Sequence, residues 1–382
     1  MNRIARVIGS LAYGPHERVF LIEQLGSSYR GTSVVVRGAR EVIMRTSSSF
    51  SDLSHIPLGT LRFPHYDTVI LALAETAAAS IEGTIRLARN ERTGAIDEGE
   101  LDSLLHHGFW NFLSTYRSEA AGKLRVSELD IVVANVAISG VRIGTHTVFN
   151  PLDFSGKEVF LSFRATFVPR TFLPTMRAIG AYAHGNVIVV ERGVILAAAC
   201  NEPVIFADIG DTRTAAYAAG GEEGMYRGAY AWGVSHITRA LADYFGVDER
   251  VVPALLNRYT NNQISERVRY AVNRVVREET KKVSVWLKEI ADGERKKRRI
   301  AVRYMVSSDC PVPQAFFEGL SAEYTSFPSS HEGGDTAGPA RKAERSVSGS
   351  VRALILYPYL HPHYQPINQL LQRRVKWLVP HQ

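Results

Sequence analysis

The sequence predicts an α/β fold organised in two halves, and three observations lead to this prediction. Segments with strand character alternate with helical segments along most of the chain. Each half contains a strand, a tight glycine turn and a second strand in succession, first around Gly26 and again around Gly210. The chain has 382 residues, of which 45% are hydrophobic and 22% are charged. This length is too great for one average domain. The composition is that of a globular protein and excludes global disorder.

The first half is expected to begin with strands, because apolar and β-branched residues dominate residues 17–45 on both sides of a Gly/Ser turn. Residues 97–118 have the pattern of a helix, since Asp97 can cap the first turn and apolar side chains recur with helical spacing after it. An alanine-rich segment follows residue 73. The other elements expected in this half are strands over 67–73, 128–136, 157–168 and 186–190 and a helix over 171–184.

The second half contains the longest helical pattern of the chain, residues 264–290, whose apolar side chains form one stripe. A shorter helix over 235–245 ends at Gly246, a residue suited to the left-handed C-cap conformation. The other elements expected here are strands over 203–208, 212–218 and 300–306 and a helix that starts within 314–320.

The C-terminal region begins with a stretch, residues 324–350, that contains no Leu, Ile, Met or Trp and is rich in Ser, Gly and Ala. Such a segment buries too little apolar surface to order itself, so we expect a flexible linker or loop. A strand over 351–357 and a basic amphipathic helix are predicted after it.

The two glycine turns have the chemistry of phosphate-binding loops. A tight turn between strands points backbone N–H groups and hydroxyls at a phosphate, and glycine permits the close approach. Asp208 lies at the end of a strand, where a carboxylate can position Mg²⁺ through water. Either turn alone would be interpreted as a plain β-hairpin, but two turns in corresponding places are more informative.

The paired turns resemble those of the actin and heat-shock-chaperone ATPase superfamily, whose two phosphate loops each have an Asp-x-Gly core. Asp208-Ile-Gly210 with Thr212 and Thr214 resembles the second loop. Within the superfamily the sequence is most similar to the FtsA family of cell-division actins, with the pilus protein family PilM as second choice. This similarity rests on the segment that begins at Gly233 and on residues 69–168, which resemble the FtsA inserted subdomain.

The resemblance implies an actin-like (ribonuclease H-like) fold of two lobes with an FtsA-type inserted subdomain. It divides the chain into the first lobe (1–73 and 169–202), the inserted subdomain (74–168), the second lobe (203–323), a linker or loop (324–350) and a C-terminal strand with an amphipathic helix (351–382).

The resemblance also implies a nucleotide site, with ATP and Mg²⁺ as cofactors if the loops are active and none if they are not. Asp208 would hold the metal. The implied nucleotide-binding residues are Gly26, Ser27, Ser28, Asp208, Gly210, Asp211, Thr212, Thr214 and Gly233. Three departures weaken this site: Gln24 replaces the first-loop Asp, the adenosine loop reads Ser307–Pro311 without glycine, and Pro253 and Leu256 fall near the family's Glu/Lys pair. We therefore expect weak ATP hydrolysis or none, and no catalytic residue is assigned.

The C-terminal segment has the pattern of an interfacial membrane helix, with Pro366 at its start. FtsA proteins end in a similar anchor, although Arg374 here projects from the middle of the apolar face. Packing of this helix in the core is the equally weighted alternative. The expected membrane-binding residues are Ile367, Leu370, Leu371, Val375 and Leu378 on the apolar face, Trp377 near its border, and Arg373 and Lys376 on the opposite, polar face.

The function implied is that of a cytoplasmic scaffold, peripheral at the inner face of the cell membrane, that links filaments of an FtsZ-like tubulin homologue or other division proteins to anionic lipid. Self-association into filaments or oligomers is expected by analogy. The two cysteines, Cys200 and Cys310, are too few for a disulfide framework and indicate a reducing compartment.

Two alternatives remain open. One is a PilM-like adaptor of type IV pilus assembly that binds a short peptide from a membrane partner. The other is a nucleotide-free scaffold that binds nucleic acid through residues 264–303. This stretch has 13 Lys and Arg against 6 Asp and Glu, a surplus equal to the whole formal charge of +7. Nucleic acid is the less favoured partner, because no aromatic residue interrupts the Arg/Lys run and no recognised motif is present.

Overall fold

The structure is a computed structural model. It describes residues 17–37, 41–53, 56, 63, 65–89, 94–200, 203–219, 224–298, 303–308, 324–326, 349–356 and 364–375.

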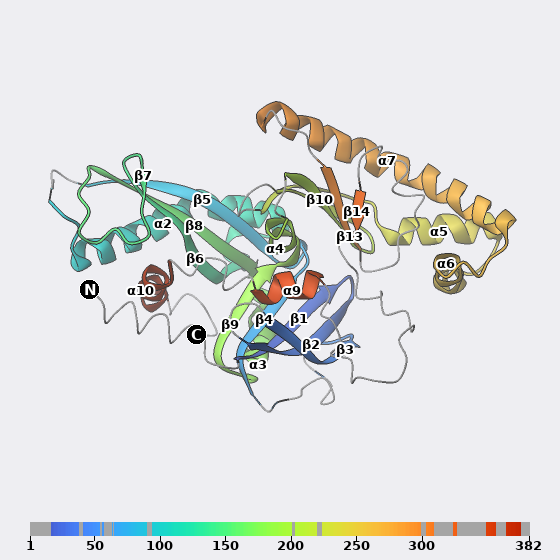
Figure 1. Ribbon diagram of the computed structural model, residues 1–382, viewed down its shortest axis with the longest axis horizontal. Coiled ribbons are helices and arrows are strands. Elements are labelled where there is room, and N and C mark those ends of the chain that lie inside the picture. The colour runs from blue at the N-terminus through green and yellow to red at the C-terminus, as the bar shows by residue number, and fades with distance from the viewer. Residues whose placement is uncertain are drawn as a thin grey trace.

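The first lobe is built on a five-stranded sheet with the order β3-β2-β1-β4-β9 (Figure 1). Its first three strands form an antiparallel meander, and the last two run parallel to β1. Strand β4 is buried along almost its whole length, as its continuous apolar run predicts. The strands are β1 (Glu17–Leu25), β2 (Ser28–Arg37), β3 (Glu41–Phe50), β4 (Tyr66–Leu73) and β9 (Ala183–Glu191).

The second lobe repeats this topology with the order β12-β11-β10-β13-β14. An antiparallel meander again comes first, and two strands then run parallel to its first strand. The glycine turns around Gly26 and Gly210 therefore occupy equivalent places in the two lobes. The strands are β10 (Val204–Ile209), β11 (Thr214–Ala219), β12 (Gly224–Tyr230), β13 (Arg303–Ser308) and β14 (Tyr324–Ser326).

Between β4 and β9 the chain forms a separate four-stranded sheet, which we call the inserted subdomain. Its order is β5-β8-β6-β7, and helix α2 (Glu98–Leu124) covers one face with Leu105, Phe109 and Phe112. Asp97 caps α2 as predicted, since its side chain accepts a hydrogen bond from the Glu100 N–H at 2.7 Å. The strands are β5 (Ala79–Ala88), β6 (Ile131–Ile143), β7 (His146–Thr147) and β8 (Glu158–Pro169).

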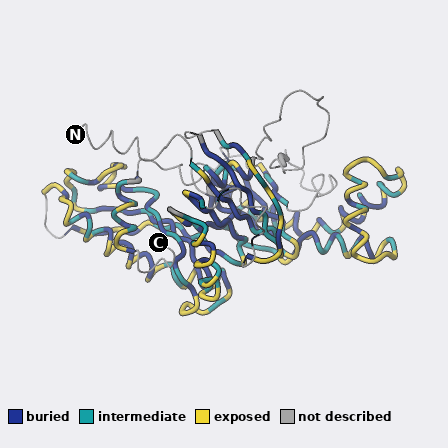
Figure 2. Tube along the Cα trace, turned by 90° about the horizontal axis from the view of Figure 1, so that it is seen from below, coloured by how far each residue is buried: buried dark blue, intermediate teal, exposed yellow. Residues whose placement is uncertain are grey.

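Helices lie between and outside the two lobe sheets (Figure 1). Helices α4 and α9 pack between the sheets in one shared core, α3 lies on the outer face of the first sheet, and α5, α6 and α7 cover the outer face of the second. Figure 2 shows buried positions in the middle of the molecule and exposed positions at its two ends, formed by the inserted subdomain and by α6 with the start of α7. The helices are α3 (Leu173–Gly180), α4 (Arg192–Ala198), α5 (Val234–Phe245), α6 (Val252–Thr260), α7 (Glu266–Arg298), α9 (Gly349–Leu356) and α10 (Gln365–Val375), with short 3₁₀ turns η1 (Glu128–Asp130), η2 (Arg170–Phe172) and η3 (Glu249–Val251).

Two expectations about secondary structure are corrected. The segment predicted as a strand over 351–357 is helix α9, which is buried between the lobes; a short apolar run in such a place shows no helical period. Residues 324–326, expected in a linker, form β14 beside β13. The alanine-rich segment, for which no element was predicted, contains strand β5. The helix expected from 314–320 lies outside the described residues. None of the helices described is long and apolar enough to cross a membrane.

Candidate functional site

The two glycine turns meet at the boundary between the lobes. A Cβ added to Gly26 would lie 3.6 Å from Cβ of Asp211, so the first turn rests directly against the second. Gly233 approaches the second turn still more closely, because an added Cβ would lie 2.5 Å from the Gly210 oxygen and 2.4 Å from the Asp211 oxygen. The structure thus brings together the turns and the glycine that the sequence assigned to one site.

Several polar groups at the second turn are used within the protein, whereas the Ser27 and Thr212 side chains are exposed. The N–H groups of Val234 and Ser235, at the start of α5, donate to the carbonyl oxygens of Gly210 (3.1 Å) and Asp211 (2.8 Å). The Thr214 hydroxyl is buried and donates to the Trp232 carbonyl at 2.9 Å. A helix N-terminus binds phosphate through its own unsatisfied N–H groups, and here two of them already have partners.

The first turn shows the same internal use of its polar groups. The Ser28 hydroxyl donates to the Leu25 carbonyl at 3.1 Å. Gln24, at the place of the family's Asp, accepts a hydrogen bond from the Ala74 N–H at 3.1 Å and so joins the ends of β1 and β4. This contact is structural and gives Gln24 a role that does not involve a metal.

Asp208, the predicted metal ligand, lies against an arginine. It is 8% exposed, and its Oδ1 is 3.3 Å from Nη1 of Arg192, the first residue of α4. The same guanidinium donates to the Ser307 hydroxyl at 3.1 Å, so Arg192, which directly follows β9 of the first lobe, is held by two residues of the second lobe. A buried guanidinium supplies the positive charge that Mg²⁺ would bring to this carboxylate, and two cations side by side would repel each other. These residues therefore do not fit a Mg²⁺ site of the expected kind.

A second buried ion pair lies beside the first, at the end of β9. Glu191 is fully buried and accepts hydrogen bonds from Nζ of Lys123 at 2.6 and 2.7 Å, from the Tyr217 hydroxyl at 2.8 Å and from the Ser80 N–H at 2.7 Å. The Lys123 ammonium also lies 3.8 Å from the ring centre of Tyr226. Glu191 therefore ties together the first lobe, the inserted subdomain and the second lobe.

Burial changes the acidity of groups around this pair. The pKa of Tyr217 is raised well above its usual range, mainly by desolvation and also by the charge of Glu191. Desolvation likewise raises the pKa of Glu75, against the attraction of Arg213, whose Nε lies 3.9 Å from its carboxylate. With Asp208 and Arg192, three carboxylates and three cations meet at this place, which we call the lobe junction (Glu75, Lys123, Glu191, Arg192, Asp208 and Arg213).

Sequence reasoning did not assign a role to Glu191, Arg192 or Lys123. A pattern was present, because Glu191-Arg192 is a charged pair between two apolar runs, and both residues are almost fully buried. Charged residues are seldom buried unless they are paired, so a Glu-Arg pair at the end of a buried strand indicates a functional or junction position.

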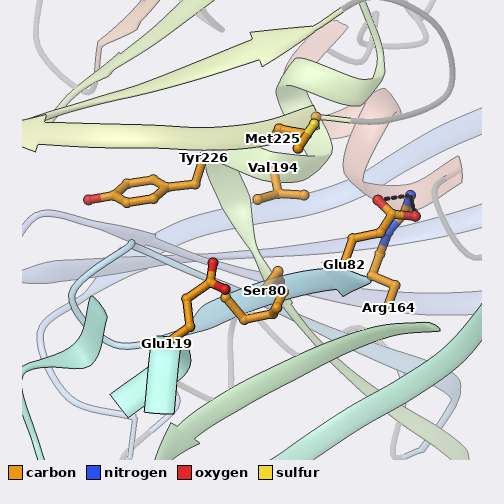
Figure 3. A pocket seen from close by; sticks show the side chains of 9 residues that line it. Ser80, Glu82, Glu119, Arg164, Val194, Met225 and Tyr226 are labelled. Carbon is orange, nitrogen blue, oxygen red and sulfur yellow. Dashed lines mark hydrogen bonds and ion pairs between the residues drawn. The ribbon is translucent and has the colours of Figure 1, made fainter. Parts of the chain in front are cut away.

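A small groove lies next to the junction, between the edge strands β5 and β12 (Figure 3). Ser80 and Glu82 line it from β5, and Met225 and Tyr226 line it from β12. Glu82 forms an ion pair with Arg164 at 3.2 Å.

The predicted membrane-binding helix packs against the inserted subdomain. In α10 the side chains of Ile367, Leu371 and Val375 are at most 2% exposed and belong to the subdomain core, and Leu370 is partly buried there. Arg373 is exposed, while Trp377, Leu378 and Lys376 lie outside the described residues. In this conformation the described apolar face of the helix is in the core, the second of the two alternatives for this segment.

The polar side of α10 also contacts the subdomain. The Asn368 side chain accepts a hydrogen bond from the Ile138 N–H at 2.6 Å and donates to the Ile138 carbonyl at 3.2 Å. Gln372 donates to the Val136 carbonyl at 2.8 Å. All three bonds use backbone groups of β6 on the side opposite to β8, where a neighbouring strand would otherwise bind.

No family model matches this sequence, and a search of curated proteins finds no significant match. Among solved structures, a chain of the PilM-PilN type IV pilus biogenesis complex aligns with 90% of this chain and 98% of its own length, at a TM-score of 0.51 and 11% identity. The ethanolamine utilization protein EutJ from Carboxydothermus hydrogenoformans aligns over 82% and 85% (TM-score 0.37, 13% identity). ParM from Bacillus thuringiensis with ATP aligns over 90% and 98% (TM-score 0.30, 8% identity).

Sequence identities of 8–13% support a similarity of fold and nothing more specific. The two lobes with repeated topology, the paired turns at their boundary and the alignment over almost the whole chain agree with one another. This chain has an α/β, actin-like fold.

Proposed function

We propose that this protein is a PilM-like adaptor that holds a short segment of a membrane-associated partner on its inserted subdomain, at the inner face of the cell membrane, and works without hydrolysing nucleotide. The observation that supports this proposal best is the way in which α10 binds the subdomain. This short amphipathic helix covers an apolar surface of the subdomain, and its polar side chains form hydrogen bonds with the backbone at the edge of β6.

The contacts of α10 are those of a recognition site rather than of simple core packing. Asn368 bonds both backbone groups of Ile138, as a residue of a paired strand would do. These bonds require the Asn368 and Gln372 side chains on the helix, and Ile367, Leu371 and Val375 add apolar specificity. The surface thus suits a segment with Ile, Asn, Leu, Gln and Val at this helical spacing, whether from this chain or from a partner.

Independence from nucleotide follows from the lobe junction. Arg192 provides the charge that a metal would otherwise provide to Asp208, and the start of α5 is bonded to the second turn. Charged contacts within the chain therefore hold the lobes together, a task that the family gives to a bound nucleotide. The protein is accordingly proposed to act as a scaffold and not as an ATPase.

An FtsA-like linker of division filaments is the second candidate, because it shares the fold and the amphipathic C-terminal helix. In that function the helix binds lipid through its apolar face, which requires α10 to leave the subdomain. We place this candidate second because Leu371 is fully buried and Asn368 is bonded to β6.

The adaptor proposal is tested with the full chain and a fluorescent peptide of residues 364–382. Leu371→Asp places a charge in the subdomain core and should release α10, so that the labelled peptide binds in trans, whereas the wild-type protein should not bind it. Arg373→Asp is the matched control, since Arg373 is exposed on the same helix. Equal peptide binding by all three proteins, or no binding by any, would refute the recognition surface.

Nucleotide independence is tested separately by calorimetric titration of the wild-type protein with ATP and Mg²⁺. We expect no binding heat at millimolar ATP. Micromolar affinity would show that the junction opens to accept nucleotide, and this part of the proposal would then be wrong.

A further inference from the structure

The long helix α7 has a solvent-facing side that neither the junction nor the inserted subdomain uses. Its 33 residues cross the outer face of the second lobe and extend to its edge (Figure 1). Val272, Val276 and Leu287 are fully buried against the second sheet and α5. The opposite side of α7 therefore faces away from the lobe.

That outer side is a narrow cationic stripe. At about 100° per residue, one sector of roughly 80° contains six Lys and Arg side chains and one acid, Asp292. Five of the cations recur every seven residues, and the first and last are about 42 Å apart along the helix. The stripe consists of Arg267, Arg274, Arg277, Lys281, Lys288 and Arg295.

The stripe also contains exposed non-polar side chains. Tyr270 is 72% exposed and Val285 is 57% exposed, and both fall in the same sector as the cations. The two side chains lie about 22 Å apart along the helix axis. Each of them can enter the interfacial region of a bilayer while the cations beside it meet the headgroups.

The acids near the stripe do not cancel its charge. Arg274 lies 3.5 Å from Glu278, and Arg295 lies 3.5 Å from Asp292. All four side chains are at least 48% exposed, and ion pairs of this kind contribute little and are screened by salt. Five of the six acids of α7 lie outside the sector, and Glu278 is one of the three that flank it, so an approaching anionic surface meets cations first.

We propose that the outer side of α7 is a docking surface for an anionic lipid bilayer. A bilayer has two features that complement the stripe. Its anionic headgroups attract the six cations, and its interfacial region accommodates Tyr270 and Val285. Nucleic acid would bind the cations through its phosphates, but it has no apolar region in which the Val285 side chain could be buried. The stripe is also convex and straight, which suits a flat surface over its length.

This surface is independent of the adaptor proposal, because it lies on the second lobe and α10 lies on the inserted subdomain. It also differs from the membrane helix expected from the sequence, since α7 keeps its apolar face in the core and contacts lipid only with its outer side. If both proposals hold, the partner segment and the lipid surface bind at opposite ends of the molecule.

The test is co-sedimentation of the full chain with vesicles of phosphatidylcholine alone and of phosphatidylcholine with a minor fraction of phosphatidylserine, at low and high salt. Binding is expected only to the anionic vesicles and should fall as salt rises. Each cation near an anionic surface contributes on the order of five-fold in binding. The triple variant Arg277→Glu, Lys281→Glu and Lys288→Glu should therefore weaken binding by roughly a hundred-fold or more.

A matched control changes the same total charge elsewhere. Lys157→Glu, Arg170→Glu and Arg177→Glu reverse three exposed cations outside the second lobe, and this variant should bind nearly as the wild type does. Circular dichroism of both variants verifies that they fold. Equal loss of binding by the two variants, or no preference for anionic vesicles, would overturn the proposal.

Two further outcomes separate lipid from other polyanions. Val285→Asn should weaken vesicle binding and leave its salt dependence unchanged. If a short DNA duplex binds through the stripe and anionic vesicles do not, the surface is a nucleic-acid interface and the lipid assignment is wrong.

Discussion

The lobe junction and the outer stripe of α7 contain similar numbers of ionisable side chains in opposite surroundings. At the junction three carboxylates and three cations are gathered between three parts of the fold, and Glu191, Arg192 and Asp208 are all less than 9% exposed. On α7 five exposed cations and the half-buried Lys288 lie along one side of the helix, with one acid among them. The comparison teaches that charge count does not decide what charged residues do; burial and pairing decide it.

The difference has a physical basis. A buried charge loses its hydration, so it is tolerated only when a partner and hydrogen bonds replace that hydration, and each partner becomes essential for the other. An exposed cation keeps its hydration and contributes little to stability, and it remains free to attract an anionic surface. We therefore expect junction substitutions to reduce stability and stripe substitutions to reduce binding.

The largest effect is expected from removal of the Lys123 ammonium. Lys123→Met retains the length of the side chain but leaves Glu191 buried with its charge uncompensated, which should lower the free energy of unfolding by about 3–5 kcal/mol. Urea unfolding followed by circular dichroism measures this loss. Lys282→Met on exposed α7 is the control and should change stability by less than about 0.5 kcal/mol. Similar small changes in both variants would show that the junction pair is not critical.

A smaller loss is expected from Asp208→Asn, which preserves shape and removes the charge beside Arg192. The guanidinium keeps its hydrogen bond to Ser307, so we expect a loss of about 1–3 kcal/mol. Urea unfolding with added Mg²⁺ tests whether Arg192 is the counter-ion of Asp208. If it is, Mg²⁺ should not stabilise either the wild type or the variant. Stabilisation of the wild type alone by Mg²⁺ would contradict it.

The fold was accessible from the sequence because its features are local. The strand-like segments on both sides of Gly26 and of Gly210 predicted the paired turns. The helical spacing of apolar residues predicted the buried face of α7. Helix α9 was mistaken for a strand, since a short segment buried between two lobes lacks the polar positions that reveal a helical period.

The junction was not accessible in the same way, because its contacts are distant in sequence. Lys123 and Glu191 are 68 positions apart, and Arg192 and Ser307 are 115 apart. Which charged residue meets which depends on how the sheets and the inserted subdomain pack together. For α10 the apolar stripe indicated which side would be covered, but not that β6, 230 positions away, would cover it.

The pH dependence of stability provides a third test of the junction. Desolvation raises the pKa of Glu75 above its ordinary value of 4.5, so between that value and the raised pKa the folded state holds more protons than the unfolded state. Stability from this group is therefore present below pH 4.5 and lost as pH rises through the raised pKa. Relative to Glu75→Gln, the wild type should lose stability over this window in urea unfolding at several pH values. A parallel pH profile of the two proteins would contradict the burial of an ionised Glu75.

The smallest effect on stability is expected from the stripe, and it completes the comparison. Neutralising Lys281 and Lys288 together as Lys281→Gln and Lys288→Gln removes two charges from a row of like charges and leaves the buried face of α7 unchanged. Each substitution should alter the free energy of unfolding by no more than about 0.5 kcal/mol, and relief of repulsion should make any change favourable at low salt and smaller at high salt. Urea unfolding at both salt concentrations measures this. A loss greater than about 1.5 kcal/mol would mean that these cations maintain the fold as those of the junction do, and burial would then no longer separate the two regions.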